Sequence, residues 1–244
     1  MSEKQQNKPI FLWCVPRSIS TAFEKMMAHS GLFAVHGEPF IDIYKQGLRS
    51  DKEFQSASRA FDLGYAKLLS AAQRQYLFVK DMAYHAAPFI SDDHIRSAIH
   101  TFLVRDPRYS IPSLFRMRPD YSEDQPGFSG MVTLYDRIAA IQQVQPLVID
   151  ADSLIAQPEE SMRRYFDYIG VPLPDTNRLL QWPKGSREEW QGRESWHIDA
   201  INSQSFVRKY ETIDPKLLPE KVIRSIELNL PHYQYMLNHT KSSI

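Results

Sequence analysis

The sequence lacks the features of several large classes of protein. It has a single cysteine, Cys14, so no disulfide can form within the chain, and this favours a reducing compartment. It has no excess of basic residues, since 29 lysines and arginines balance 29 aspartates and glutamates, which argues against a general nucleic-acid-binding protein. Its first apolar run, residues 10–15, is too short for a signal peptide or a membrane span. We therefore expect a cytoplasmic protein that binds neither nucleic acid nor membranes.

Repeats, low-complexity tracts and paired metal-ligand spacings such as H-x-x-x-H are also missing, and we expect no bound metal. What the chain does have is 43% hydrophobic residues in 244 positions, enough to build a substantial core. This length fits one domain that covers residues 1–244. The sequence does not indicate an oligomeric state.

Short apolar runs alternate with segments of helical period, and this alternation predicts an α/β fold with a central parallel sheet flanked by helices. The predicted strands are residues 10–15, 32–35, 76–79, 100–104 and 147–150. The predicted helices are residues 21–29, 54–72, 110–117, 131–144, 158–169 and 219–230, with Pro112 in a first turn. Two polar stretches, 118–130 and 182–206, are expected to be loops at the active site.

A candidate anion site follows the first predicted strand. Residues 16–21, Pro-Arg-Ser-Ile-Ser-Thr, open a helix, where unpaired N–H groups, hydroxyls and the Arg17 guanidinium can surround a phosphate or sulfate. The alternative interpretation is an ordinary capped helix beside a solvent-exposed arginine. The loop has no glycine and no Walker lysine, so it does not match the Walker A pattern, and this argues against an ATP-dependent kinase.

This Pro-Arg-Ser-x-Ser-Thr pattern resembles the 5′-phosphosulfate loop of sulfotransferases that use 3′-phosphoadenosine-5′-phosphosulfate (PAPS), in the bacterial and Golgi-type branch. A second segment strengthens the resemblance. Arg105 ends the fourth predicted strand and Ser113 follows eight residues later, as in the family's 3′-phosphate motif. The alternative is an Arg105–Asp106 or Arg108–Asp106 surface ion pair, with Ser113 merely exposed.

The resemblance implies a P-loop-kinase-like three-layer fold, PAPS as the donor and adenosine 3′,5′-bisphosphate as the product, with no metal. It also implies which residues bind the donor. Those expected at the phosphosulfate are Arg17, Ser18, Ile19, Ser20, Thr21 and Ala22. Those expected at the 3′-phosphate are Arg105 and Ser113, with Lys184 as a further candidate from the 182–206 stretch.

Sulfuryl transfer also needs a base for the acceptor's proton and positive charge for the leaving phosphate. Arg17 is the candidate for the charge. Glu38, which follows the second predicted strand, is the first candidate for the base, and His36 and His85 remain alternatives. Lys80 ends the third predicted strand, where it can either touch the transferring group or pair with Asp81 at the surface.

These patterns together predict a sulfotransferase that moves a sulfuryl group from PAPS to a hydroxyl of a small-molecule acceptor. Two other functions stay open. One is a P-loop-type kinase that uses ATP and magnesium on a small molecule, and the other is a non-catalytic protein that binds adenosine bisphosphate. The sequence does not separate hydroxyl from amine acceptors.

Overall fold

The computed structural model describes residues 7–207 and 217–240. The ends of the predicted 1–244 domain and residues 208–216 lie outside the described residues. Five strands form one sheet in which every neighbouring pair is parallel. Their order across the sheet is β2 (Phe33–Gly37), β3 (Tyr76–Met82), β1 (Ile10–Cys14), β4 (Ile99–Val104) and β5 (Leu147–Asp150).

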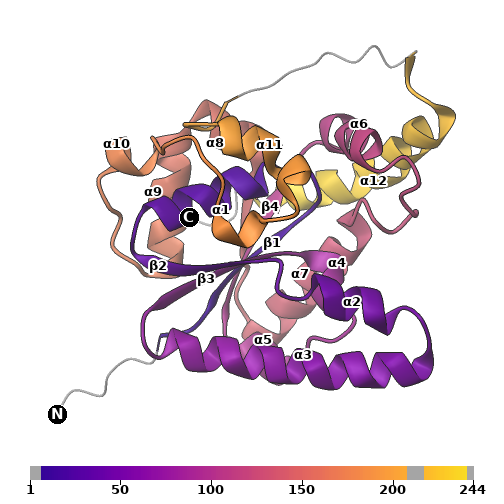
Figure 1. Cartoon of the computed structure of the whole chain (residues 1–244), viewed down its shortest axis with the longest axis horizontal. Coiled ribbons are helices and arrows are strands. Elements are labelled where there is room, and N and C mark those ends of the chain that lie inside the picture. The colour runs from indigo at the N-terminus through magenta and orange to yellow at the C-terminus, as the bar shows by residue number, and fades with distance from the viewer. Residues whose placement is uncertain (1–6, 208–216, 241–244) are drawn as a thin grey trace.

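Strand β1 lies at the centre because its sequence is a continuous apolar run, as is typical of a parallel strand covered on both faces. Phe11 and Trp13 point to one face, and Ile10, Leu12 and Cys14 to the other. The first face packs against α3 (Asp51–Ala72), α4 (Ala83–Ala86), α5 (Asp92–Arg96), α7 (Phe128–Gln142) and α12 (Glu220–Asn238). The second packs against α1 (Ser20–His29), α8 (Ala151–Ala156), α9 (Pro158–Ile169) and α10 (Thr176–Leu179). The molecule therefore has the three layers that the sequence predicts (Figure 1).

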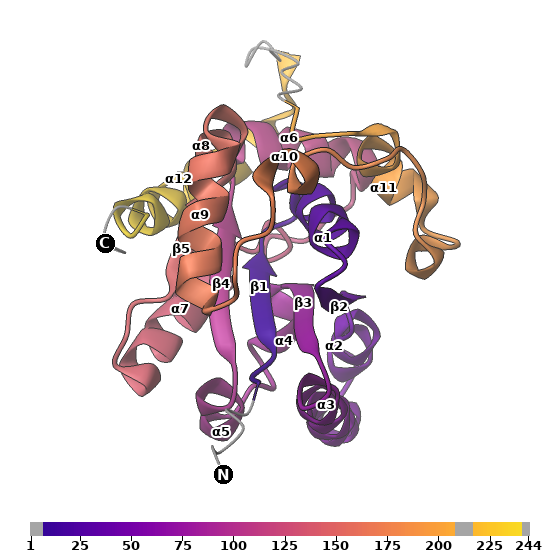
Figure 2. The same ribbon diagram turned by 90° about the vertical axis from the view of Figure 1, so that its left-hand side faces the viewer.

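The carboxyl ends of the strands face the remaining helices. These helices are α2 (Ile41–Gly47), α6 (Pro107–Met117), the 3₁₀ turn η1 (Glu188–Trp190) and α11 (Glu194–Asn202). In Figure 2 the β1 arrow points toward the end of the molecule where α6 and α11 lie, and α11 lies beside α1. Ligands of open parallel sheets bind at this end of the strands.

Several predicted boundaries are wrong for local physical reasons. Helix α6 begins at Pro107 rather than Ser110, because the Asp106 side chain accepts a hydrogen bond from the Arg108 amide and proline suits the first helical position. Pro112 consequently lies inside the helix and not in its first turn. Helix α7 begins at Phe128, so the predicted 118–130 loop ends earlier.

Two further elements are longer than predicted. Strand β3 continues to Met82, which places Lys80 and Asp81 inside the sheet. Helix α12 continues past Pro231 to Asn238, because Tyr233 and Met236 carry its apolar face on into the core. The predicted 182–206 loop contains the turn η1 and the helix α11.

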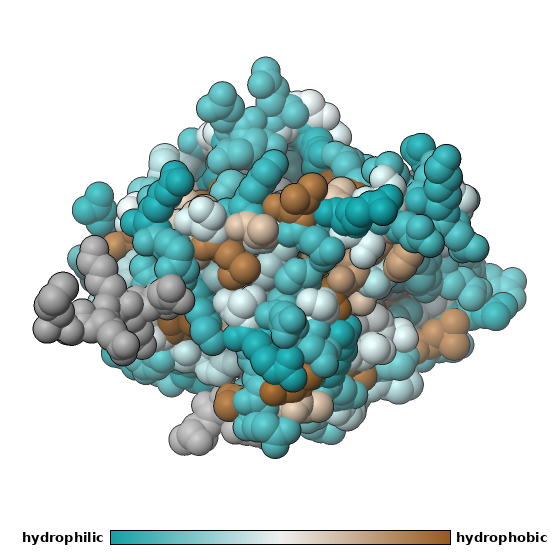
Figure 3. Space-filling model, turned by 90° about the horizontal axis from the view of Figure 1, so that it is seen from below, coloured by the Kyte–Doolittle hydropathy of each residue, from teal (hydrophilic) through white to brown (hydrophobic). Residues whose placement is uncertain are grey.

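The face seen in Figure 3 is largely hydrophilic, and its hydrophobic residues form small, separate groups. Scattered apolar side chains of this kind are normal for a protein surface. Among the helices in residues 7–207 and 217–240, none combines the length and hydropathy that crossing a bilayer requires.

Candidate active site

A cavity of about 570 Å³ lies at the carboxyl end of the sheet. Its wall includes the loop between β1 and α1, the residue after β2, the start of α4, helix α6, and most of α11. The predicted residues on the wall are Arg17, Ile19, Ser20, Thr21, Ala22, Glu38, His85, Arg105 and Ser113. The structure thus brings most of the predicted site residues to one cavity, although they are far apart in the sequence.

The β1–α1 loop has an unusual backbone. Arg17 and Ile19 have φ angles of 62° and 63°, in the left-handed region that β-branched and bulky residues seldom occupy. Ile19 is also the N-cap of α1, and no side chain caps that helix end. The first turn carries no acidic residue. Strain and an uncapped helix N-terminus at a cavity together fit an anion-binding site.

Arg17 joins the two predicted anion motifs. Its Nε donates to Ser113 Oγ at 2.9 Å, and its backbone carbonyl accepts from Nη1 of Arg105 at 3.0 Å. The Nη atoms bind α11, where Nη1 donates to the Trp196 carbonyl at 3.0 Å and Nη2 pairs with Asp199 at 3.2 Å. Arg17, Arg105 and Ser113, which come from two separate segments of the chain, therefore form one cationic cluster near the N-terminus of α1.

The alternative interpretation of the Arg105–Ser113 motif, a surface ion pair with Asp106 and an exposed Ser113, is correct only in part. Arg108 does pair with Asp106, but Ser113 is buried and bonded to Arg17. Two predicted donor ligands lie elsewhere. Ser18 is fully buried and its hydroxyl donates to the Val15 carbonyl at 2.7 Å, away from the cavity wall. Lys184 is exposed and is not part of that wall.

Glu38 stands directly after β2 with a φ angle of 53°, and its amide donates to the Lys80 carbonyl on the neighbouring strand. Its Oε1 accepts from the Lys80 ammonium at 2.6 Å. Burial raises the pKa of Glu38, but the charge and hydrogen bond of Lys80, with smaller contributions from His85 and His197, together outweigh burial and lower the pKa to about 2. Glu38 is thus an ionised carboxylate on the wall of the cavity.

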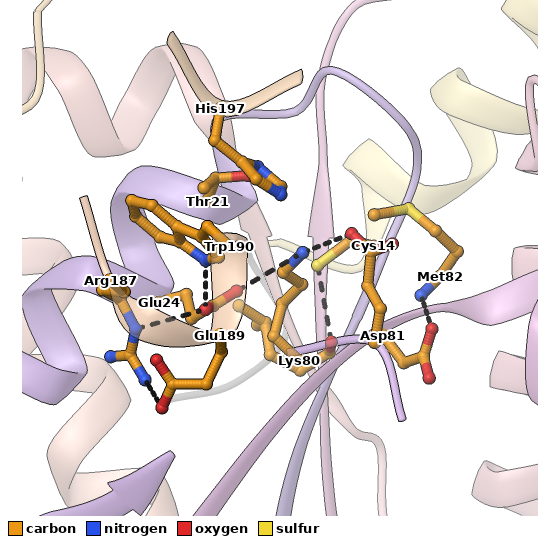
Figure 4. Close-up of polar contacts among 12 residues, drawn as sticks. Cys14, Thr21, Glu24, Lys80, Asp81, Met82, Arg187, Glu189, Trp190 and His197 are labelled. Carbon is orange, nitrogen blue, oxygen red and sulfur yellow. Dashed lines mark hydrogen bonds and ion pairs between the residues drawn. The ribbon is translucent and has the colours of Figure 1, made fainter. Parts of the chain in front are cut away.

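Lys80 is buried and does not form the surface pair with Asp81. Its ammonium lies between two carboxylates, Glu38 and, at 3.5 Å, Glu24 of α1. Burial lowers the pKa of Lys80, but the two carboxylates outweigh burial and raise it above the ordinary value. Figure 4 shows the lysine reaching from β3 toward Glu24. Lys80 is therefore a fixed cation beside the candidate base.

The two histidine alternatives are placed differently. His36 is exposed and does not line the cavity. His85 is buried on the wall, and its Nδ1 lies 2.7 Å from Asp81 Oδ1. Asp81 also accepts from the amides of Phe40 and Met82, so it is itself firmly oriented. This contact leaves Nε2 as the nitrogen through which His85 could act.

Helix α11 covers the start of α1. The Lys25 ammonium donates to the carbonyls of Ala200 and Ile201 at 2.8 and 3.2 Å, and Thr21 Oγ1 lies 3.4 Å from His197 Nδ1. His197 packs on Trp190, and burial together with the Lys80 charge lowers the pKa of His197 to about 4. The 182–206 stretch is thus held over the cationic cluster by side chains of α1.

Several residues at this site were not predicted. The buried Glu24 and Lys25 were missed, although a charged pair between the inward-facing Phe23 and Met26 is a visible signal. Four additional cationic residues line the cavity, namely Lys45, Arg116, Arg118 and Arg193. No group of three or more histidine, cysteine or acidic residues that could hold a metal occurs in the parts of the chain that the structure describes.

Comparison with known proteins identifies the family. The model of the sulfotransferase domain matches residues 8–238. The chain belongs to the sulfotransferase family. Over 95% of its length, the chain is 24% identical to branched-chain-amino-acid aminotransferase-like protein 2 of Arabidopsis thaliana. It is also 24% identical, over 96% of its length, to branched-chain-amino-acid aminotransferase-like protein 1 of the same organism. The chain spans only 42% of each of these relatives.

Two solved structures share the fold of this sulfotransferase. The sulfotransferase domain of the Synechococcus PCC 7002 olefin synthase has a TM-score of 0.51 and 16% identity, and covers 93% of this chain and 97% of its own. The sulfotransferase domain from the curacin biosynthetic pathway has a TM-score of 0.54 and 17% identity, and covers 91% and 97%. The sheet with helices on both faces is accordingly the P-loop-kinase-like fold of sulfotransferases.

Proposed function

We propose that this protein transfers a sulfuryl group from PAPS to a hydroxyl group of a small-molecule acceptor. The observation that carries the proposal is the junction of the two anion motifs, in which Arg17 bonds Ser113 and Arg105 bonds the Arg17 carbonyl. A nucleotide with anionic groups at both its 5′ and 3′ ends matches two adjoining cationic motifs. A donor with one anionic end would leave one of them unused.

The chain's own residues supply each part of the reaction. The α1 amides and Arg17 hold the 5′-phosphosulfate, and Arg105 with Ser113 holds the 3′-phosphate. The acceptor oxygen attacks sulfur, the bond from sulfur to the bridging phosphate oxygen breaks, and the acceptor proton passes to Glu38. Arg17 and the α1 N-terminus stabilise the charge left on the phosphate, so the roles divide between charge stabilisation and proton transfer.

Donor binding requires one rearrangement at Arg17. In the structure described here the guanidinium is occupied by Asp199 and by the Trp196 carbonyl of α11. The donor's 5′-phosphosulfate competes with Asp199 for the same guanidinium. Movement of α11 is therefore part of donor entry.

Binding of the product nucleotide tests the donor class. Isothermal titration with adenosine 3′,5′-bisphosphate in the absence of magnesium should show tight binding that Arg105→Ala largely abolishes. Failure of the wild-type protein to bind this nucleotide, together with binding of ATP and magnesium, would favour the kinase alternative. Binding without any donor turnover would favour the non-catalytic alternative.

The dependence of rate on pH tests the base. A carboxylate with a pKa of about 2 stays ionised from pH 5 to pH 8, so proton transfer to Glu38 predicts no loss of kcat/KM between pH 8 and pH 5 from this group. A histidine base would instead lose activity toward low pH, because a protonated imidazole cannot accept the acceptor's proton. The pH profile of sulfuryl transfer, measured with the small alcohol 2-phenylethanol as acceptor, distinguishes a Glu38 base from a histidine base.

A further inference from the structure

Glu24 is a buried carboxylate to which the proposed reaction gives no role. It is 1% exposed and lies one turn into α1, behind the anion-binding end of the helix. Its Oε2 lies 3.5 Å from the Lys80 ammonium. Its Oε1 accepts from the Trp190 indole at 2.9 Å and lies 3.7 Å from the Arg187 guanidinium. Figure 4 shows these groups converging on Glu24 from β3 and from the segment around η1.

The backbone around Glu24 leaves room for this carboxylate. A Cβ added to Gly37, at the end of β2, would come within 2.8 and 2.9 Å of the two Glu24 oxygens. Glycine at this position therefore lets the carboxylate approach β2 and lie next to the Lys80–Glu38 pair. Glu24 and Glu38 then share one buried ammonium.

The sharing matters when Glu38 changes charge. Before the reaction Lys80 has two carboxylate partners. Once Glu38 takes the acceptor's proton it is neutral, and without Glu24 the Lys80 ammonium would be a buried charge with no counter-ion. An uncompensated buried charge is strongly unfavourable, so the proton transfer itself would become unfavourable. With Glu24 in place, one buried ion pair survives the transfer.

We propose that Glu24 is a positioning residue for sulfuryl transfer, because its carboxylate holds the Lys80 ammonium in place and neutralises it while Glu38 accepts the acceptor's proton. This rests on the proposed function. Glu24 touches neither donor nor acceptor and acts through Lys80. Its hydrogen bond from Trp190 and its ion pair with Arg187 also tie this charge arrangement to the segment around η1.

The test is a double-mutant cycle on the rate of donor consumption. Single-turnover decay of ³⁵S-labelled PAPS is followed with water and with 2-phenylethanol as acceptors, for wild type, Glu24→Gln, Lys80→Met and the double variant. Glu24→Gln should lower the rate by roughly 10- to 100-fold, less than the roughly 10²- to 10⁴-fold that a general base itself contributes, because Glu24 acts only through Lys80. The same change should add little in the Lys80→Met background, because the partner through which Glu24 acts is gone.

Two controls separate this role from a purely structural one. Affinity for adenosine 3′,5′-bisphosphate should stay within about twofold of wild type in Glu24→Gln, since the donor ligands are untouched. Glu24→Asp, which retains the charge, should keep more activity than Glu24→Gln. It also provides a second variant if the glutamine variant does not fold.

The outcomes that overturn the proposal are distinct from those that overturn the proposed function. A Glu24→Gln rate within twofold of wild type, an equal loss in both Lys80 backgrounds, or equal losses in the aspartate and glutamine variants would each contradict a role for the Glu24 charge. A wild-type protein that binds no adenosine bisphosphate, or binds it and consumes no donor, would refute sulfuryl transfer itself and the role of Glu24 with it.

Discussion

Two helices of this protein begin in opposite ways. Helix α3 starts after Ser50, whose hydroxyl accepts from the Glu53 amide, and its first turn carries Asp51 and Glu53. Helix α1 starts after Ile19, with no capping side chain and no acidic residue in its first turn. The chain thus satisfies one helix N-terminus with its own side chains and leaves the other uncapped, as the proposed binding of the donor at α1 requires.

The backbone conformations at the starts of the two helices also differ. Ser50 at the start of α3 is extended, a conformation that any residue adopts easily, whereas Ile19 has a φ angle of 63°. A β-branched residue in the left-handed region is strained by about 1–2 kcal/mol. The α1 terminus therefore lacks both a cap and a relaxed backbone, as expected where a site is shaped for a ligand rather than for stability.

Removing the cation at the α1 terminus should have the largest effect. Arg17→Ala deletes the guanidinium that joins both anion motifs, so affinity for adenosine 3′,5′-bisphosphate should fall roughly 100-fold, in line with the loss of charge-assisted hydrogen bonds. Calorimetry measures this directly. An unchanged affinity would mean that the nucleotide does not bind at this helix.

Making α1 resemble α3 should have the next largest effect. Ile19→Asp provides a capping carboxylate in a conformation that aspartate tolerates better, so the protein should gain about 1 kcal/mol of stability and lose roughly 10-fold in bisphosphate affinity. Ile19→Asn is the matched control, with the same shape and no charge. If the two variants bind the nucleotide equally weakly, repulsion between the carboxylate and the phosphates is not the cause.

Relieving the contact between Arg17 and α11 should have a smaller effect of opposite sign. Asp199→Asn removes the carboxylate that pairs with Arg17, and bisphosphate affinity should rise about 3- to 5-fold, as the loss of a competing, partly exposed ion pair allows. Asp42→Asn removes an equal charge, one that pairs with Lys45 and Arg193 instead of Arg17. Equal gains in both variants would point to general electrostatics rather than to competition at Arg17.

The smallest effect on binding is expected at α3. Ser50→Ala should leave bisphosphate affinity unchanged while costing about 1 kcal/mol of stability, the usual value of an N-cap. Thermal or urea unfolding and calorimetry on the same samples check both halves. A change in affinity would show that the two helix ends are coupled, contrary to the contrast drawn above.

The fold was largely predictable because its signals are local. The apolar run at residues 10–15 and the helical period at 158–169 each appear in a short window of sequence, and both elements are found close to their predicted places. The start of α6 was missed because the Asp106 cap, also a local signal, was not recognised. The predicted end of β3 is too early because Lys80 and Asp81 are polar residues, whose burial depends on partners remote in the sequence, namely Glu38 for Lys80 and the Phe40 amide for Asp81.

The candidate site was predictable where its residues belong to a motif or follow the end of a predicted strand. Arg17, Arg105 and Ser113 lie together on the cavity wall, as the two motifs imply. Glu24 was not found, because its partners Lys80, Arg187 and Trp190 come from remote parts of the chain and no spacing relates them. The role expected for Lys184 finds no support in its exposed position outside the cavity wall.

Consumption of ³⁵S-labelled PAPS by wild type and Glu38→Gln, with bisphosphate affinity measured on the same preparations, tests the central claim most directly. Sulfuryl transfer with Glu38 as the base predicts that the wild-type protein consumes the donor and that the variant binds the nucleotide normally but reacts roughly 100-fold more slowly or worse. A variant that reacts at the wild-type rate, or a wild-type protein that leaves the donor intact while binding its product, would contradict the account.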